Sequence, residues 1–123
     1  MEREMMRVEV VRTIHFEKNV KGLLKRYRSL ESDLDVLISV IEKYPEGKFP
    51  VSFRLQGYPG CYFVKVKKIR SNSFPQKGVN SGFRLIYCWK EKAGQIQLIE
   101  LYHKKDKELE DSVLLKKFCN EIG

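Results

Sequence analysis

The sequence predicts a single α+β domain with the element order β-α-α-β-β-β-α. A chain of 123 residues has the length for one modest core. Apolar residues make up 42% of it, which is typical of a folded protein. The hydrophobic spacing alternates between the strand period of two and the helical period of 3.6. We expect a mostly antiparallel four-stranded sheet, an N-terminal αα-hairpin and a C-terminal helix, all within residues 1–123, with residues 1–6 frayed.

The first half of the chain predicts one strand and two helices. Residues 7–14 are rich in β-branched side chains, which favour a strand. Residues 16–27 switch to helical spacing, with Thr13 or His15 at the start. Ser29 is the predicted N-cap of a second helix, which ends near residue 44, just before a proline.

The second half predicts three strands and a closing helix. Residues 46–60 are rich in prolines and glycines and are expected to form a turn-rich connector. The expected elements after it are a strand over 61–69, a loop over 71–80, strands over 81–90 and 96–102 joined by a short turn, and a helix in the tail from residue 106.

Cysteine usage and hydropathy restrict the class of protein. Cys61, Cys88 and Cys119 are far apart and form no CxxC pair, so buried thiols are expected. The two histidines are not spaced as metal ligands, and we expect no metal and no cofactor. The start, MEREMMR, is followed by no apolar segment of the signal-peptide type, and no apolar run has the length of a membrane span. A cytoplasmic location with no membrane partner is expected.

The net charge of +8 favours a polyanionic partner. Arg84 is the most informative cation, because it lies in a central strand on the face opposite Phe83 and Leu85. A cation between apolar neighbours needs a partner or a groove. Arg84 either holds a phosphate through its bidentate fork or forms a salt bridge to Glu100 on the next strand.

The strand before Arg84 offers further cations on both of its faces. Lys65 and Lys67 share one face, and Lys68 and Arg70 share the other. Only one of these pairs is expected to line a groove with Arg84. The other pair is expected to form a solvated edge that blocks the addition of another strand.

The last strand ends in a cluster of polar side chains. His103 either exchanges protons near neutral pH or is a surface histidine at a strand end. Tyr102 either contacts a base, acts as a weak acid or packs half-buried. Lys104 and Lys105 are neighbours, so one of them must point away. Lys77 adds a cation from the predicted loop over residues 71–80.

Metal-independent cleavage of RNA requires a proton acceptor for the 2′-hydroxyl, cations around the phosphorane and a proton donor for the 5′-oxygen. The sequence offers many cations but no paired catalytic carboxylates and no phosphate-binding glycine loop at a helix start. A nuclease of this composition would act mainly through positioning and charge.

Three segments in this order and spacing resemble the RelE/HigB branch of the RelE/ParE toxin–antitoxin superfamily, over nearly the whole chain. The two-helix opening of that family is similar to FEKNVKGLLKRYRSLESDLDVLISVIEKYPEGKFP. Its Lys-x-Arg strand and its Gly-aromatic-Arg strand are similar to KIR and GVNSGFRLIY. Its strand ending in Tyr-x-Lys before an acidic last helix is similar to IQLIELYHKKDKELED.

The resemblance implies a RelE-like toxin of a type II toxin–antitoxin pair. Such toxins are metal-independent endoribonucleases that cut mRNA on the ribosome, contact ribosomal RNA, inhibit translation and form hetero-oligomers with a cognate antitoxin. By motif position, Arg84 matches the phosphate-binding arginine, Lys65 a basic position of the preceding strand, and Lys104 the lysine of Tyr-x-Lys. The candidate catalytic residues are Arg84, Lys65, His103, Lys104 and Tyr102, and the candidate RNA-binding residues are Lys67, Lys68, Arg70, Lys77 and Lys105.

Two departures from the family pattern keep other functions open. Phe63 lies where a basic residue is often found, and Asp111 lies near the position at which some members carry a tyrosine. The alternatives are a ParE-like inhibitor of DNA gyrase, and a catalytically weakened toxin that only binds its antitoxin.

Overall fold

The structure, a computed structural model, describes residues 7–47 and 52–122. These residues form three α-helices and a five-stranded sheet with the order β1-β5-β4-β3-β2. β1 pairs with β5 in parallel, and the other three pairings are antiparallel. The elements are β1 (Glu9–Arg12), α1 (Ile14–Leu24), α2 (Leu30–Lys43), β2 (Ser52–Arg54), β3 (Phe63–Val66), β4 (Phe83–Lys90), a 3₁₀ turn (Glu91–Ala93), β5 (Gln95–His103) and α3 (Ser112–Ile122).

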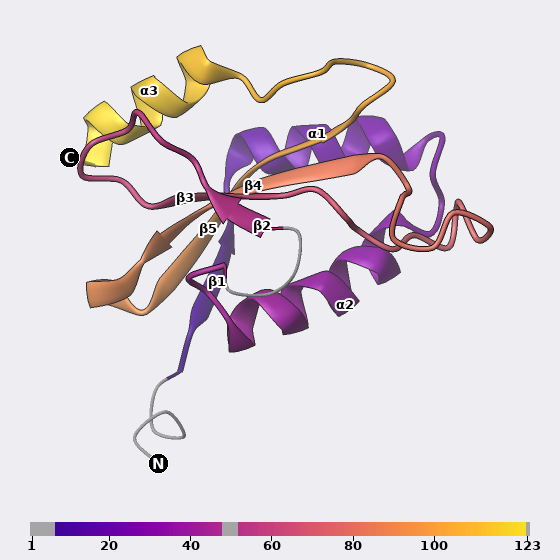
Figure 1. Cartoon of the computed structure of the whole chain (residues 1–123), viewed down its shortest axis with the longest axis horizontal. Helices are drawn as coiled ribbons and strands as arrows, with labels where there is room; N and C mark the ends of the chain where they lie inside the picture. The colour runs from indigo at the N-terminus through magenta and orange to yellow at the C-terminus, as the bar shows by residue number, and fades with distance from the viewer. Residues whose placement is uncertain (1–6, 48–51, 123) are drawn as a thin grey trace.

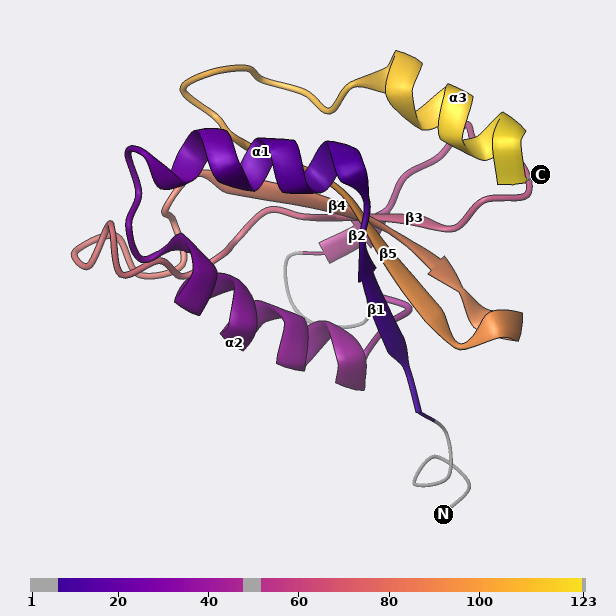
Figure 2. The same ribbon diagram turned by 180° about the vertical axis from the view of Figure 1, so that it is seen from behind.

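The sheet is covered on both faces, so the molecule has two apolar cores. The larger core joins α1 and α2 to one face of the sheet, through side chains such as Phe16, Leu34 and Leu85. The smaller core joins α3 to the other face, through Leu115 and Ile86 among others. Figure 1 shows α2 and α3 on opposite sides of the strands, and Figure 2 shows the same arrangement from behind.

The alternation predicted for the central strand is confirmed. Phe83, Leu85, Tyr87 and Trp89 of β4 belong to the core on the α1–α2 side. Ile86 and Cys88 belong to the core under α3, and Arg84, two residues before Ile86, therefore lies on the α3 side. The sheet thus has a helix-hairpin face and an α3 face, and Arg84 lies on the latter.

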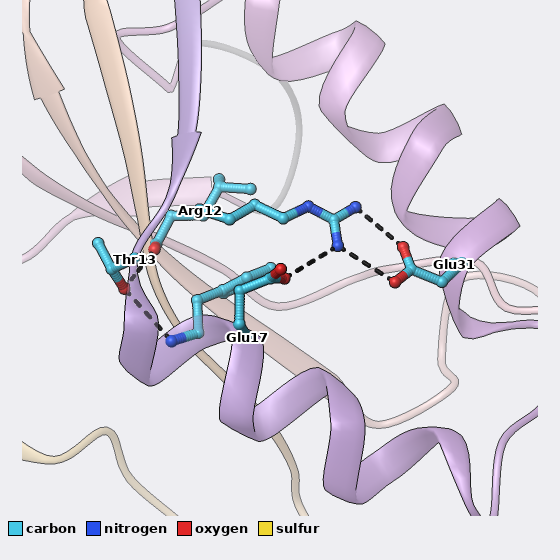
Figure 3. Close-up of polar contacts among 6 residues, drawn as sticks. Arg12, Thr13, Glu17 and Glu31 are labelled. Carbon is cyan, nitrogen blue, oxygen red and sulfur yellow. Dashed lines mark hydrogen bonds and ion pairs between the residues drawn. The ribbon is translucent and has the colours of Figure 1, made fainter.

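Polar contacts fix the two N-terminal helices to the sheet and to each other. Thr13 caps α1, because its Oγ1 accepts the backbone N–H of Phe16 at 3.2 Å. Arg12, at the end of β1, bonds Glu31 of α2 at 2.9 Å and Glu17 of α1 at 3.3 Å, as Figure 3 shows. This arginine therefore holds the αα-hairpin against the strand from which it starts.

Ser29, the predicted N-cap of α2, makes no capping bond with its side chain. Its Oγ donates instead to the carboxylate of Asp33, at 2.8 Å. Asp33 also accepts bonds from Ser71 Oγ at 2.6 Å and from the backbone N–H of Asn72 at 3.0 Å. The start of α2 thus anchors the loop that follows β3, which explains why Ser29 does not serve its own helix.

The prediction of four strands is wrong by one. The connector contains β2, a strand of three residues that pairs with β3 at the edge of the sheet. β3 is also shorter than expected and ends at Val66. α3 begins at Ser112 rather than directly after residue 106. The predicted fraying of residues 1–6 lies outside the described residues.

Cys61 and Cys119 form a disulfide, so the expectation of three thiols is wrong for these two, whereas Cys88 is a free, buried thiol. All three sulfurs lie in the core under α3. The cysteine-based argument for a cytoplasmic location fails with that expectation, because disulfides form under oxidising conditions. Within the described residues, no helix has the length and apolar character of a membrane span.

Candidate functional site

A groove of about 320 Å³ opens at the end of the sheet where β3 and β5 finish and β4 begins. Among the described residues that line it, four are cations and none is an acid. Within the described part of the chain, no ion pair involves any of these four cations. We call this feature the cationic groove; it is lined by Ser52, Phe53, Lys67, Lys68, Asn80, Gly82, Arg84 and Lys104.

The antiparallel topology brings the cations of the groove together. Lys67 directly follows β3, Arg84 is the second residue of β4, and Lys104 directly follows β5. In adjacent antiparallel strands, the end of one strand lies beside the start of the next. Lys68 also lines the groove, because β3 ends at Val66 and the strict alternation that would place Lys67 and Lys68 on opposite faces ends there.

Gly82 fixes the position of Lys104. Its carbonyl accepts the backbone N–H of Lys104 at 2.9 Å. Its φ of +100° is unfavourable for residues with a side chain, and a Cβ there would lie 2.6 Å from Nε2 of His103. A glycine is therefore required where β4 and β5 meet beside the groove.

The guanidinium of Arg84 is held by the backbone rather than by an acid. Its Nη1 donates to the carbonyl of Lys67 at 3.0 Å and to that of Phe83 at 3.3 Å. The alternative salt bridge to Glu100 is absent among the described residues, because Glu100 is bonded to Lys107 and to the backbone N–H of Asp111. Nε and Nη2 make no hydrogen bond within the same residues and can bind an anion.

Lys65 lies outside the groove, although the family pattern counts it as catalytic. It is 4% exposed, and its Nζ lies 2.6 Å from Oε1 of Glu110. Burial is the largest single influence on the pKa of Lys65 and acts to lower it, but Glu110 and Tyr102 together outweigh burial and the pKa is raised. Burial is also the largest single influence on the pKa of Glu110 and acts to raise it, but the bond from Lys65, a backbone hydrogen bond and the charges of Lys65 and Lys107 together outweigh burial, so that this pKa is lowered. The two groups therefore form a buried ion pair.

Tyr102 is opposite Arg84 in the pairing of β4 with β5, but it is buried, with 5% of its surface exposed. Its ring lies 5.8 Å from Nζ of Lys65 and 5.1 Å from Nζ of Lys107. Its hydroxyl makes no hydrogen bond within the described residues. Burial raises the pKa of Tyr102, against the opposing effect of Lys65. Tyr102 therefore faces the neighbouring ion pair rather than the groove.

No known family's sequence model and no curated protein matches the chain. Several solved structures are similar to it, including the following two. The YoeB dimer from Staphylococcus aureus has a TM-score of 0.55 and 12% identity over 79% of this chain and 98% of that one. The isolated RelE toxin of E. coli has a TM-score of 0.50 and 18% identity, over 94% of this chain and 99% of that one.

The chain has the RelE-like toxin fold.

In this RelE-like fold, His103 lies on the α1–α2 side of the sheet, away from the groove. It is 1% exposed and pairs with Phe83 in the β4–β5 register. Its ring centroid lies 5.5 Å from that of Tyr27 and 5.3 Å from that of Phe74, nearly parallel to both. Nδ1 accepts the backbone N–H of Lys105 at 3.1 Å, so Nε2 carries the proton and donates to the carbonyl of Ser81 at 2.8 Å. Neither nitrogen is available to a substrate.

The burial of His103 predicts a specific dependence of stability on pH. Burial lowers the pKa of His103, because a charged ring would lose its hydration. The pKa of an unfolded histidine is about 6.5. Below that pH the unfolded chain therefore binds a proton at this residue more readily than the folded chain does. The free energy of unfolding in urea should therefore fall as the pH drops from 7.5 to 5.5. His103→Gln should flatten this slope, and an equal slope in both proteins would contradict the assignment.

The remaining predicted RNA-binding residues do not line the groove. Arg70 and Lys77 are exposed in the loop between β3 and β4, and Lys105 is exposed after β5. Of Lys104 and Lys105, only Lys104 lines the groove, so the expected divergence of these neighbours is observed.

Four residues that line the groove were not predicted as site residues from the sequence: Ser52, Phe53, Asn80 and Gly82. Ser52 and Phe53 belong to β2, which is too short to show strand periodicity and lies in a segment rich in prolines and glycines. Asn80 and Gly82 carry no charge. The available signal for Gly82 was its place next to a strand, where an isolated glycine indicates a close approach of the backbone.

Proposed function

We propose that this chain is the toxin of a type II toxin–antitoxin pair and cuts messenger RNA on the ribosome. The observation that carries the proposal is the convergence of Lys67, Lys68, Arg84 and Lys104 in a groove that no acid lines in the part of the chain that the structure describes. The fold supports it, since the E. coli protein RelE, which has this fold, is a toxin. The net charge of +8 favours association with the phosphate-rich surface of the ribosome.

The groove supplies charge and positioning for attack by a 2′-hydroxyl. The 2′-oxygen forms a bond to the adjacent phosphorus, the bond from phosphorus to the 5′-oxygen breaks, and the products carry a 2′,3′-cyclic phosphate and a 5′-hydroxyl. Arg84 binds the phosphate oxygens through Nε and Nη2, and Lys67 adds charge around the phosphorane. The ammonium of Lys104 donates the proton to the leaving oxygen, and solvent takes the proton of the 2′-hydroxyl.

A second candidate function is a weakened toxin that binds its antitoxin without cutting RNA. One specific observation favours it: within residues 7–47 and 52–122, no carboxylate or imidazole lines the groove, and His103 and Tyr102 both lie elsewhere. In either function, we expect the cognate antitoxin to cover the groove with an acidic segment, since four cations lie there without acidic partners among the described residues.

Mapping of RNA ends after induction separates these functions. Expression of the wild type in growing cells should produce new 5′-hydroxyl ends within coding sequences, at least tenfold above those in cells expressing Arg84→Ala. The measurement is sequencing of 5′ ends with and without prior phosphorylation, which distinguishes 5′-hydroxyls from ordinary decay products. Intact transcripts with DNA damage would favour a gyrase inhibitor. Intact transcripts with normal growth would favour the weakened toxin.

A further inference from the structure

One aromatic side chain lies on the rim of the cationic groove without a place in either core. Phe53 is 44% exposed and lines the groove beside the lysines. It belongs to neither of the two apolar clusters among the described residues. An apolar ring of this size that remains in water gains little from folding.

The pairing of β2 with β3 fixes the direction in which Phe53 points. Phe53 pairs with Lys65, so both side chains lie on the α3 face of the sheet. Lys65 pairs with Ile86, which places Arg84 on the same face, two residues along. Nζ of Lys67 lies 5.9 Å from the centroid of the Phe53 ring. An exposed ring and the phosphate-binding cations therefore share one surface.

The groove is longer than a single phosphate. Phe53 belongs to β2 and Lys104 follows β5, and these strands are three places apart in the sheet. Neighbouring strands lie about 4.8 Å apart, so the groove crosses about 14 Å from its aromatic rim to its far lysine. This length accommodates a base beside a phosphate, rather than an isolated anion.

We propose that Phe53 is a stacking platform for a nucleobase of single-stranded RNA, next to the phosphate held by Arg84. Aromatic side chains beside a cationic groove are the usual means of binding single strands, because every base has a face on which a ring can stack. The inference rests on the proposed function for its substrate class, RNA. It goes beyond that function, because it assigns base recognition to β2, a strand that supplies none of the groove's cations.

The test compares two uncleavable probes of equal charge. The first is a fluorescein-labelled 2′-O-methyl pentaribonucleotide, and the second is an abasic phosphodiester of the same length. The full-length wild type should bind the base-bearing probe more tightly than the abasic one. Phe53→Leu should weaken binding of the base-bearing probe about tenfold and leave binding of the abasic probe unchanged. Phe53→Trp should bind the base-bearing probe at least as tightly as the wild type.

Tyr44→Leu is the matched control. The exposed fraction of Tyr44 is 47%, similar to the 44% of Phe53. Tyr44 instead caps the end of α2 and lines a different pocket together with Trp89. This substitution should change the binding of neither probe. Thermal unfolding of each variant establishes that Phe53→Leu, at a half-exposed edge position, remains folded.

Equal binding of the two probes by the wild type would overturn the inference, as would unchanged binding of the base-bearing probe by Phe53→Leu. These outcomes are distinct from failure of the proposed function. If Phe53→Leu weakens binding and induced cells still contain intact transcripts, the result supports base stacking on Phe53 and contradicts the proposed nuclease activity. If transcripts are cut and Phe53→Leu binds the base-bearing probe normally, the result supports the nuclease activity and contradicts base stacking on Phe53.

Discussion

Replacing Arg84 by alanine is expected to lower the rate of mRNA cleavage by about 10²–10³-fold in a reconstituted translation reaction. Arg84 is the only arginine among the described residues that line the groove, and its guanidinium is fixed by the carbonyls of Lys67 and Phe83. Two of its nitrogens remain for the phosphate within the described residues. Removing it takes away a donor fork that is already in place before the substrate arrives, which is the arrangement that stabilises a transition state most.

The conservative variant Arg84→Lys tests geometry separately from charge. A lysine keeps the positive charge but lacks the planar fork, so it should recover only a small part of the lost rate. The measurement is the single-turnover rate of cleavage of one defined mRNA on purified ribosomes.

Arg54→Ala is the control for loss of one charge. Arg54 pairs with Val64 on the α1–α2 side of the sheet, and its guanidinium lies 4.1 Å from the centroid of the Tyr62 ring. We expect this variant to cleave at the wild-type rate. A cleavage rate for Arg84→Ala within fivefold of the wild-type rate would contradict a catalytic role for Arg84.

The second large effect concerns stability and the pair formed by Lys65 and Glu110. Replacing Glu110 by alanine leaves the buried ammonium of Lys65 without its counter-charge and is expected to cost about 3–5 kcal/mol of unfolding free energy. The measurement is unfolding in urea at neutral pH, where both groups are charged. The pKa of Glu110 is lowered, so this contribution is present above the carboxylate's unfolded pKa and is lost as the pH falls through its folded pKa.

A double variant separates the structural role of Lys65 from a catalytic one. Lys65→Met combined with Glu110→Leu removes both charges and retains apolar volume, so most of the lost stability should return. Because Lys65 lies outside the groove, the double variant should also cleave mRNA at close to the wild-type rate. A stable double variant without cleavage would return Lys65 to the catalytic residues that the family pattern indicates.

The sequence alone predicted the parts of the fold that depend on local periodicity. The helical spacing after Phe16 and the alternation from Phe83 to Trp89 reproduce the observed faces, because each core residue repeats at a fixed interval. β2 was missed, because three residues are too few to show a period. The disulfide was missed because its two cysteines are 58 residues apart, and spacing alone does not determine which cysteines pair.

The site was only partly predictable, for a related reason. Its cations could be named, but the expectation that only one pair from the strand before Arg84 lines the groove is wrong, because Lys67 comes from one pair and Lys68 from the other. Their roles depended on where each strand ends and on which face each side chain lies. Lys65 lies inside β3 and Lys67 lies just past its end, two residues along the chain, yet Lys65 is buried against Glu110 and Lys67 is open to the groove.

The bond between Cys61 and Cys119 closes a covalent ring that contains β3, β4, β5 and the groove cations Lys67, Lys68, Arg84 and Lys104. A protease that cuts within residues 71–80 would therefore leave two pieces still joined until a reductant is added. The same ring restrains the last helix, whose Cys119 is one of the two joined residues. An inhibitor that acts by displacing this helix from the sheet can do so only after a thiol has reduced the disulfide. An inhibitor that blocks the groove directly acts on the oxidised and the reduced chain alike.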